Sequence, residues 1–514
     1  MTKQTTLYRA GHIFSPALPN STAMVVTDGV ITWLGSDADA PPADRVVDLD
    51  GCLVTPAFVD SHAHITGTGS NMAGLNLANT RSATDLLDQV AAAARDLPQT
   101  AIITGGGWDE TEWTDPAMPS REALARALGG RRAYLSRTCG HIGLASPALL
   151  MERPDLAGLE GYHESGLLRL HAHRTARAAA SAATPRSQRA DAQRLALRHA
   201  ASLGIGALVE CGMPAPGSSQ GEEDFTGLLA VAAEEPVPTV FGYWGELCAA
   251  GKAKELGAHA CAGDLSVDGS IGAHTAAVGE PYHDADTRGH AYLSAADVEA
   301  HIINCAGHGI QGGFHAIGDQ AIRNVVNGVA AAAQTLGVDT VRAGRHRVEH
   351  AEMLDKQLIA GFVAFGLYAS VQPSFDARWG GAELMYATRL GRERAVASNP
   401  FGSLAGVGVP LALGSDSPVT PLDPWGGVKA AVNHHNPVQS LSPTAAFAAH
   451  TRGGWRATGD DETGVLAPGA PATFAVWDHR EPGLPDVSPQ APAPRCRRTV
   501  VSGNVIFDEE DRNE

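Results

Sequence analysis

One stretch of the sequence decides the fold: Leu53-Val54-Thr55-Pro56-Ala57-Phe58-Val59-Asp60-Ser61-His62-Ala63-His64. It is an apolar run that ends in two histidines separated by a single residue. Such a run is typical of a buried strand, and residues i and i+2 of a strand point to the same side. We therefore predict that His62 and His64 project together from a strand end, where two imidazoles can bind one metal ion.

Seven similar runs follow along the chain and alternate with alanine-rich segments of helical character. The eight predicted strands are Leu53–His64, Ile205–Gly212, Pro238–Trp244, Leu265–Gly269, Gly312–Gly318, His346–Glu352, Tyr368–Pro373 and Pro410–Asp416. Strands that alternate with helices are typical of an α/β protein with a parallel sheet. Eight of them predict a closed (β/α)8 barrel of the TIM type, with its active site at the carboxyl ends of the strands.

The two ends of the chain do not follow this alternating pattern. They consist of short strand-like runs interrupted by glycine and proline. At 514 residues the chain is long enough for one large domain with an appendage. The interval of about 70–203 is too long for one crossover helix. We expect it to be an inserted region that caps the mouth of the barrel.

Composition limits the partners and the compartment. The formal net charge of −18 argues against nucleic acid or an anionic membrane surface as a partner. Residues 1–10 lack the apolar core of a secretory signal, and no run of about 18 apolar residues predicts a membrane span. The seven cysteines show no CxxC pairing, which favours reduced thiols and a cytoplasmic location. We expect a small-molecule substrate. The oligomeric state is left open, and a homodimer is among the alternatives.

Three more residues of the metal-binding type end separate predicted strands: His315, His350 and Asp416. Together with His62 and His64 they form a set rich in nitrogen and oxygen, which suits zinc, or manganese or iron. We expect a divalent metal, zinc above all, as one or two ions. His62, His64 and Asp416 are predicted to hold the first ion, and His315 and His350 to make a second position.

Five motifs and a closing segment carry a family resemblance. They are Thr55–His64, Asp268–Gly272, His315–Asp319, Val348–Glu352 and Gly414–Pro418, with Gly464–Gly469 before the closing strands. In these motifs the sequence resembles the amidohydrolase superfamily, and within it the amidohydrolase-3 branch that includes N-substituted formamide deformylase. The resemblance runs nearly end to end. It implies that residues 1–52 and 465–514 form a composite β-sandwich domain beside a barrel domain of residues 53–464.

The expected activity is metal-dependent hydrolysis of a non-peptide C–N bond in an amide, an N-substituted formamide or a cyclic amide. In the predicted mechanism metal-activated hydroxide attacks, and Asp416 acts as general base and then general acid. His141 from the inserted region either stabilises the oxyanion or is a structural histidine. Trp108, His274 and Trp379 either line the pocket or serve packing. A deaminase on the same scaffold and a non-catalytic ligand-binding relative are the alternatives.

The sequence departs from its relatives at the metal bridge. In much of this branch a carboxylated lysine lies four residues before the aspartate–glycine pair, where this chain has Asp264. Asp264 is expected to be too short, and too deep by about 13 Å along the strand, to touch a metal. Glu210 is therefore expected to join the two metal positions. Its rival is Cys211, since D-aminoacylases, which the chain resembles locally at Cys211-Gly212, use a cysteine on this strand. Strand alternation lets only one of the two face inward, and a single-metal site is left open.

Overall fold

The chain folds into two compact units. The computed structural model describes residues 4–110, 113–137, 142–215 and 219–510. One unit consists of Met1–His64 and Leu197–Glu514, and the other of Ile65–Ala196. No helix among these described residues is long and apolar enough to cross a membrane.

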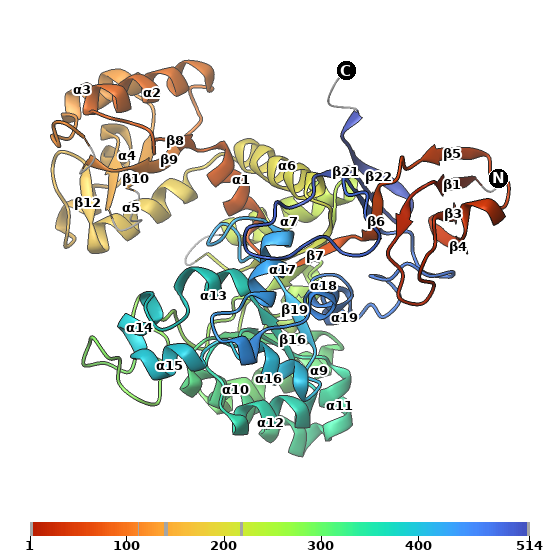
Figure 1. Cartoon of the computed structure of the whole chain (residues 1–514). Helices are drawn as coiled ribbons and strands as arrows, with labels where there is room; N and C mark the ends of the chain where they lie inside the picture. The colour runs from red at the N-terminus through yellow and green to blue at the C-terminus, as the bar shows by residue number, and fades with distance from the viewer. Residues whose placement is uncertain (1–3, 111–112, 138–141, 216–218, 511–514) are drawn as a thin grey trace. The chain divides into compact units, whose positions relative to one another are not determined.

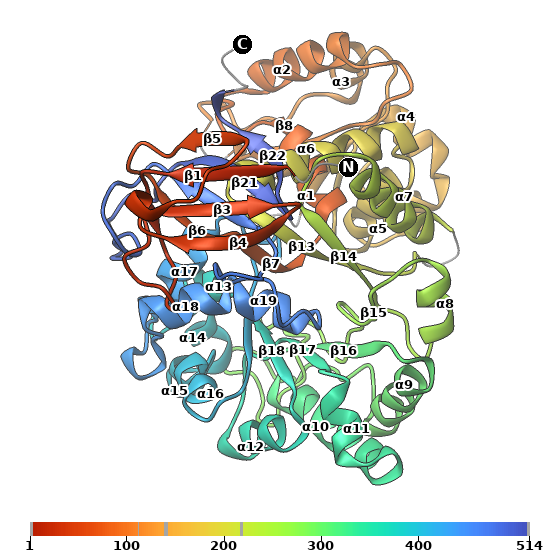
Figure 2. The same ribbon diagram turned by 90° about the vertical axis from the view of Figure 1, so that its right-hand side faces the viewer.

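The larger unit is built on an eight-stranded parallel sheet that closes on itself (Figures 1 and 2). Its strands are β7 (Phe58–Ala63), β13 (Ile205–Gly212), β14 (Thr239–Trp244), β15 (Ala260–Cys261), β16 (Gln311–Ala316), β17 (Arg347–His350), β18 (Tyr368–Val371) and β19 (Leu411–Leu413). They neighbour one another in chain order, and a parallel bridge between Ala63 and Ser417 joins the first strand to the segment after the last. The predicted (β/α)8 barrel is confirmed.

Helices on the outside of the barrel follow most of its strands (Figure 2). Their ends are fixed by capping: Ser294 and Asp297 form a capping box at the start of α9, and Gly309 ends that helix in the left-handed conformation. The helices of this unit are α7 (Gln220–Glu234), α8 (Ala250–Glu255), α9 (Ala295–His308), α10 (Asp319–Leu336), α11 (Val338–Ala343), α12 (Lys356–Phe365), α13 (Pro373–Trp379), α14 (Met385–Leu390), α15 (Arg392–Ala397), α16 (Phe401–Gly406), α17 (Pro424–Val432), α18 (Pro443–Ala449) and α19 (Arg452–Ala457).

Strands from both ends of the chain form two small sheets with one shared core, as predicted. One sheet has the order β4-β3-β1-β5, and the other β2-β6-β20-β21-β22. Their strands are β1 (Thr5–Arg9), β2 (His12–Ile13), β3 (Ala23–Thr27), β4 (Val30–Gly35), β5 (Arg45–Asp48), β6 (Leu53–Pro56), β20 (Phe474–Trp477), β21 (Cys496–Val501) and β22 (Asn504–Asp508). Met24, Val54 and Phe474 are among the buried residues that pack together between them. In Figures 1 and 2 the red N-terminal strands lie beside the blue C-terminal ones.

The predicted strand Leu53–His64 is in fact two strands in two sheets. Its first part, β6, pairs antiparallel with β20 in a small sheet, and its second part, β7, opens the barrel. The change falls after Pro56, which lacks the amide hydrogen that a longer ladder needs. Both strands are completely buried, and this explains why the whole run is apolar.

The smaller unit contains a five-stranded sheet of order β12-β11-β10-β9-β8. Its elements are α1 (Ile65–Ala73), β8 (Leu75–Asn76), α2 (Ala83–Asp96), β9 (Ile103–Trp108), α3 (Arg121–Leu128), β10 (Ala133–Arg137), β11 (Ile142–Ala145), α4 (Pro147–Glu152), β12 (Leu167–Arg169), α5 (Leu170–Ala182) and most of α6 (Arg186–Ser202). Leu86, Leu124 and Leu135 belong to one of its buried clusters. The unit spans nearly the predicted insertion, and its position over the barrel mouth stays a prediction. His141 lies outside the described residues.

Candidate metal centre

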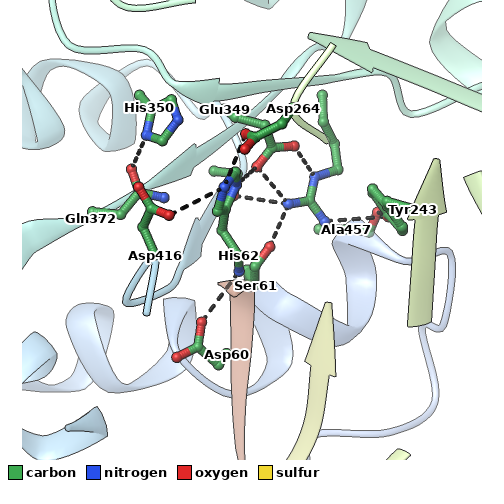
Figure 3. A network of polar contacts seen from close by, with 12 residues as sticks. Asp60, Ser61, His62, Tyr243, Asp264, Glu349, His350, Gln372, Asp416 and Ala457 are labelled. Carbon is green, nitrogen blue, oxygen red and sulfur yellow. Dashed lines mark hydrogen bonds and ion pairs between the residues drawn. The ribbon is translucent and has the colours of Figure 1, made fainter. Parts of the chain in front are cut away.

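Ligand-type side chains from four barrel strands, and from the break after a fifth, meet at the carboxyl ends of the strands. His62 lies near the end of β7 and His64 directly follows that strand, while His315 lies on β16 and His350 ends β17. Asp416 comes three residues after β19. In Figure 3 the imidazole of His62 lies at the middle of a polar network, with Asp264 on one side and Asp416 on another.

Two carboxylates face the paired histidines. Asp416 Oδ1 lies 3.2 Å from His64 Nε2 and 3.6 Å from His62 Nε2. Asp264 spans the same two rings, because its Oδ1 is 3.3 Å from His62 Nε2 and its Oδ2 is 3.3 Å from His64 Nε2. The four side chains therefore surround one small volume, with two imidazoles opposite two carboxylates.

The donor set fits a divalent metal ion. His62 Nε2, Asp264 Oδ1 and Asp416 Oδ1 are buried and make no hydrogen bond, although an unsatisfied buried polar group costs about 1–3 kcal/mol. Ligands bound at about 2.0–2.2 Å to one tetrahedral ion lie roughly 3.3–3.6 Å apart, and the spacings here are 3.2–3.6 Å. One set of ligand atoms close enough to share an ion is His62, His64 and Asp416, and another is His62, Asp264 and His350.

The expectation that Asp264 is too deep to reach a metal is wrong. The fourth barrel strand ends at Cys261, and Gly263 breaks it with a φ of +84°. Pairing with β16 resumes only at Ser266, which bridges His315. Because a break of this kind re-aims the side chains beside it, Asp264 points into the mouth. The alternating run of residues 265–269 suggested one uninterrupted strand.

Cys211, rather than Glu210, lies beside His62. The Cys211 thiol is buried near His62; burial raises the pKa of this thiol, and the neighbouring His62 opposes that rise. The next residue, Gly212, faces Phe225 of helix α7 on the outside of the barrel. Strand alternation therefore turns Glu210 outward, and the geometry gives no support to its predicted role as the bridge between two metals.

The surroundings of His350 favour a neutral ring that can bind a metal ion. Its Nδ1 lies 2.8 Å from Gln372 Oε1, so that the ring donates there and leaves Nε2 free. Burial, together with the neighbouring His315 and His62, lowers the pKa of His350 to about 3, against the opposite effect of Asp416 and Asp264. His315 packs against His350 with ring centroids 4.4 Å apart, and its Nδ1 is 3.7 Å from Asp268 Oδ1. The two predicted ligands of a second position are thus adjacent.

The backbone is strained where two of these residues sit. His350 has a φ of +69° and Asp416 a φ of +55°, in the left-handed region that residues other than glycine seldom occupy. Strain of this kind concentrates at functional sites. The carboxylate of Asp60 helps to hold the barrel closed here, because its Oδ1 accepts hydrogen bonds from the backbone N–H groups of His62 and Ser415 at 3.2 and 3.0 Å.

Sequence reasoning missed the role of Arg347 and Glu349. His62 Nδ1 lies 3.0 Å from Glu349 Oε2, and Arg347 donates to both oxygens of that carboxylate. Burial would raise the pKa of Glu349, but Arg347 and His62 bring it down to about 2, so the carboxylate is ionised. The sequence contains an indication of this ion pair. Arg347 and Glu349 are residues i and i+2 of a buried strand, so their opposite charges point to the same side, into the interior.

The aromatic candidates fall in different places. Trp379 is half-buried and packs against Phe375 at 4.9 Å, and Phe375 lies parallel to the ring of His350 at 5.9 Å. His274 is hydrogen-bonded to Asp284 at 2.8 Å. Trp108 belongs to the smaller unit, where it is buried in the core.

Comparison with known proteins gives the family. The model of the amidohydrolase family matches residues 45–507. The putative amidohydrolase YtcJ of Bacillus subtilis is 26% identical over 534 residues, covering 95% of this chain and 96% of that protein. The protein LONG AFTER FAR-RED 3 of Arabidopsis thaliana is 27% identical over 520 residues, covering 91% and 87%.

Among solved structures, an uncharacterized metal-dependent hydrolase from Pyrococcus furiosus shares the fold, with a TM-score of 0.77. It is 24% identical, and the match covers 92% of this chain and 99% of that one. The barrel fold and the cluster of histidines and carboxylates at its mouth are those of a hydrolase of the barrel type. The chain belongs to the amidohydrolase family, and the predicted superfamily and amidohydrolase-3 branch are confirmed.

Proposed function

We propose that the chain hydrolyses a non-peptide C–N bond of a small molecule: an amide, an N-substituted formamide or a cyclic amide. The observation that carries the proposal is the convergence of His62 Nε2, Asp264 Oδ1 and Asp416 Oδ1, all buried without hydrogen bonds, at the mouth of the barrel. A protein that used this mouth only to bind a ligand would have no need for such a set.

The residues that would hold the ion are His62, His64, Asp264, His350 and Asp416, with His315 beside them. Imidazole and carboxylate ligands suit zinc, and we propose zinc as the metal. A divalent ion held there supplies Lewis acidity, which lowers the pKa of water from about 15.7 toward 7 and polarises a carbonyl group. Asp264 takes the place that a carboxylated lysine has in many relatives, so this centre needs no added carbon dioxide.

Asp416 is the proposed general base. Burial alone would raise the pKa of Asp416, but the neighbouring His62, His64 and His350 hold it below its ordinary value, so the carboxylate is ionised at neutral pH. It accepts the proton of the attacking water and then returns it to the leaving nitrogen. His350, kept neutral by burial, needs no proton exchange during the cycle. A role for His141 at the oxyanion stays a prediction.

A substrate panel tests the proposal. The zinc-loaded protein is assayed against matched linear amides, N-substituted formamides and cyclic amides, with release of acid, amine and ammonia measured separately. The proposal expects acid or amine release that is lost on chelation and in Asp416→Asn. Ammonia release from an amidine carbon, without cleavage of any amide, would make the chain a deaminase; metal binding without any turnover would make it a ligand-binding relative.

A further inference from the structure

A buried polar column runs through the barrel interior beneath the metal centre. At its middle is Arg347, which is completely buried on β17. Its guanidinium donates to Glu349 through Nε at 2.9 Å and through Nη2 at 2.8 Å. Nη2 also reaches Ser370 Oγ on β18 at 2.8 Å and the carbonyl oxygen of Ser61 on β7 at 2.6 Å.

The other end of the column is anchored away from the metal ligands. Arg347 Nη1 lies 3.2 Å from the hydroxyl of Tyr243 on β14, and the guanidinium carbon is 4.7 Å from the centre of that ring. Gln311 on β16 is hydrogen-bonded to Tyr243 and donates to the carbonyl oxygen of Ala457 at 2.9 Å. Figure 3 shows the series from Ala457 and Tyr243 through to Glu349 and His62.

Stability alone does not explain a buried ion pair in this place. Removing two charges from water costs several kcal/mol per ion, and an apolar pair of similar volume is often as stable or more stable. What an apolar pair lacks is an acceptor for His62. Glu349 Oε2 lies 3.0 Å from His62 Nδ1 and accepts a hydrogen bond from the N–H group there. This bond fixes the tautomer and turns Nε2 toward Asp264 and Asp416.

We infer that Arg347 and Glu349 are positioning residues for the metal centre: Arg347 orients Glu349, and Glu349 holds the His62 ring with Nε2 facing the ion. The inference rests on the proposed metal-dependent function. If the ion pair served stability alone, the affinity for metal and the free energy of unfolding would fall and recover together in its variants. A positioning role predicts that these two properties change independently.

The test compares Arg347→Met with the double variant Arg347→Met/Glu349→Leu. Zinc affinity is measured by competition with a chromophoric chelator, and stability by urea unfolding of the metal-free protein. Both variants should lose about 10–100-fold in zinc affinity. The unfolding midpoint should fall in Arg347→Met, which leaves Glu349 buried without its partner, and recover in the double variant. Arg345→Met is the matched control, because Arg345 pairs with Asp461 at the surface and should keep wild-type affinity.

A conservative pair keeps the test informative if the double variant does not fold. Glu349→Gln retains an oxygen that can accept a hydrogen bond from His62 Nδ1–H, so it should keep more zinc affinity than Glu349→Leu. Equal affinities in that pair, or wild-type affinity in Arg347→Met, would overturn the inference while leaving the metal site intact. A wild-type protein that binds no zinc would instead overturn the proposed function.

Discussion

Gly414, which follows β19, lies where the last barrel strand meets the first, and it offers a test of the site's geometry. A Cβ atom added there would lie 2.6 Å from the backbone nitrogen of His62 and 3.0 Å from Asp60 Oδ1. The first distance is about 0.8 Å short of an ordinary contact near 3.4 Å. Because the closest atom belongs to the backbone of β7, it has no rotamer that would move it away. Gly414→Ala must therefore shift β7, and with it His62.

Overpacking of a filled interior costs about 1–3 kcal/mol, and a misplacement near 1 Å at a catalytic centre costs about 10²-fold in rate. Gly414→Ala should thus unfold at lower urea, with the difference taken from midpoints at constant m-value, and lose most of its bound zinc. Gly406→Ala is the control, since nothing lies within 4 Å of the added atom at the end of α16; it should stay within about 0.5 kcal/mol of wild type. Wild-type stability and zinc content in Gly414→Ala would show instead that the added methyl group fits without moving β7.

Three further outcomes are expected. Asp416→Asn should bind zinc more weakly, because it loses one anionic ligand, and when loaded with excess zinc it should lose about 10²–10⁴-fold in turnover, as measured by kcat on the best amide of the panel; wild-type kcat would remove Asp416 from the mechanism. Zinc reconstitution of the metal-free protein should recover the same activity with and without bicarbonate, because Asp264 already supplies a carboxylate between His62 and His64; a bicarbonate requirement would contradict this. Burial lowers the pKa of His301 to about 4, below the ordinary 6.5, so its contribution to stability is complete above pH 6.5 and is lost as pH falls toward 4. That loss is up to about 3 kcal/mol at 1.36 kcal/mol per pH unit, and His301→Gln should flatten the urea-unfolding profile across this range; an unchanged slope would exclude His301 as its source.

The barrel and the grouping of histidines at its mouth could be predicted from the sequence because local patterns determine both. Apolar runs mark strands that are buried on both faces, and the spacing of His62 and His64 places both rings at one strand end. The breaks between and within strands were harder to find. Pro56 marks a break in the ladder, but nothing local shows that the strands before and after it belong to different sheets, since both parts are equally apolar and buried.

The site could be predicted only where it depends on one strand at a time. The position of Asp264 depends on a break at Gly263, whose backbone conformation leaves no trace in an alternating pattern. The choice between Glu210 and Cys211 depends on which side of β13 faces inward, and neither residue decides that by its own chemistry. The polar column beneath His62 is formed by contacts between β7, β14, β17 and β18. The order of residues along the chain does not show these contacts, so the column could not be predicted.

His62, His64, Asp264 and Asp416 are proposed to hold a catalytic metal ion, and the metal content of the purified protein shows whether they do. Elemental analysis of the purified protein, the double variant His62→Ala/His64→Ala and Asp264→Asn should be made beside circular dichroism of each. We expect at least one equivalent of divalent metal in the wild type, almost none in the double variant and a clear loss in Asp264→Asn, all with native spectra. Equal metal content in the wild type and the double variant would contradict the proposal.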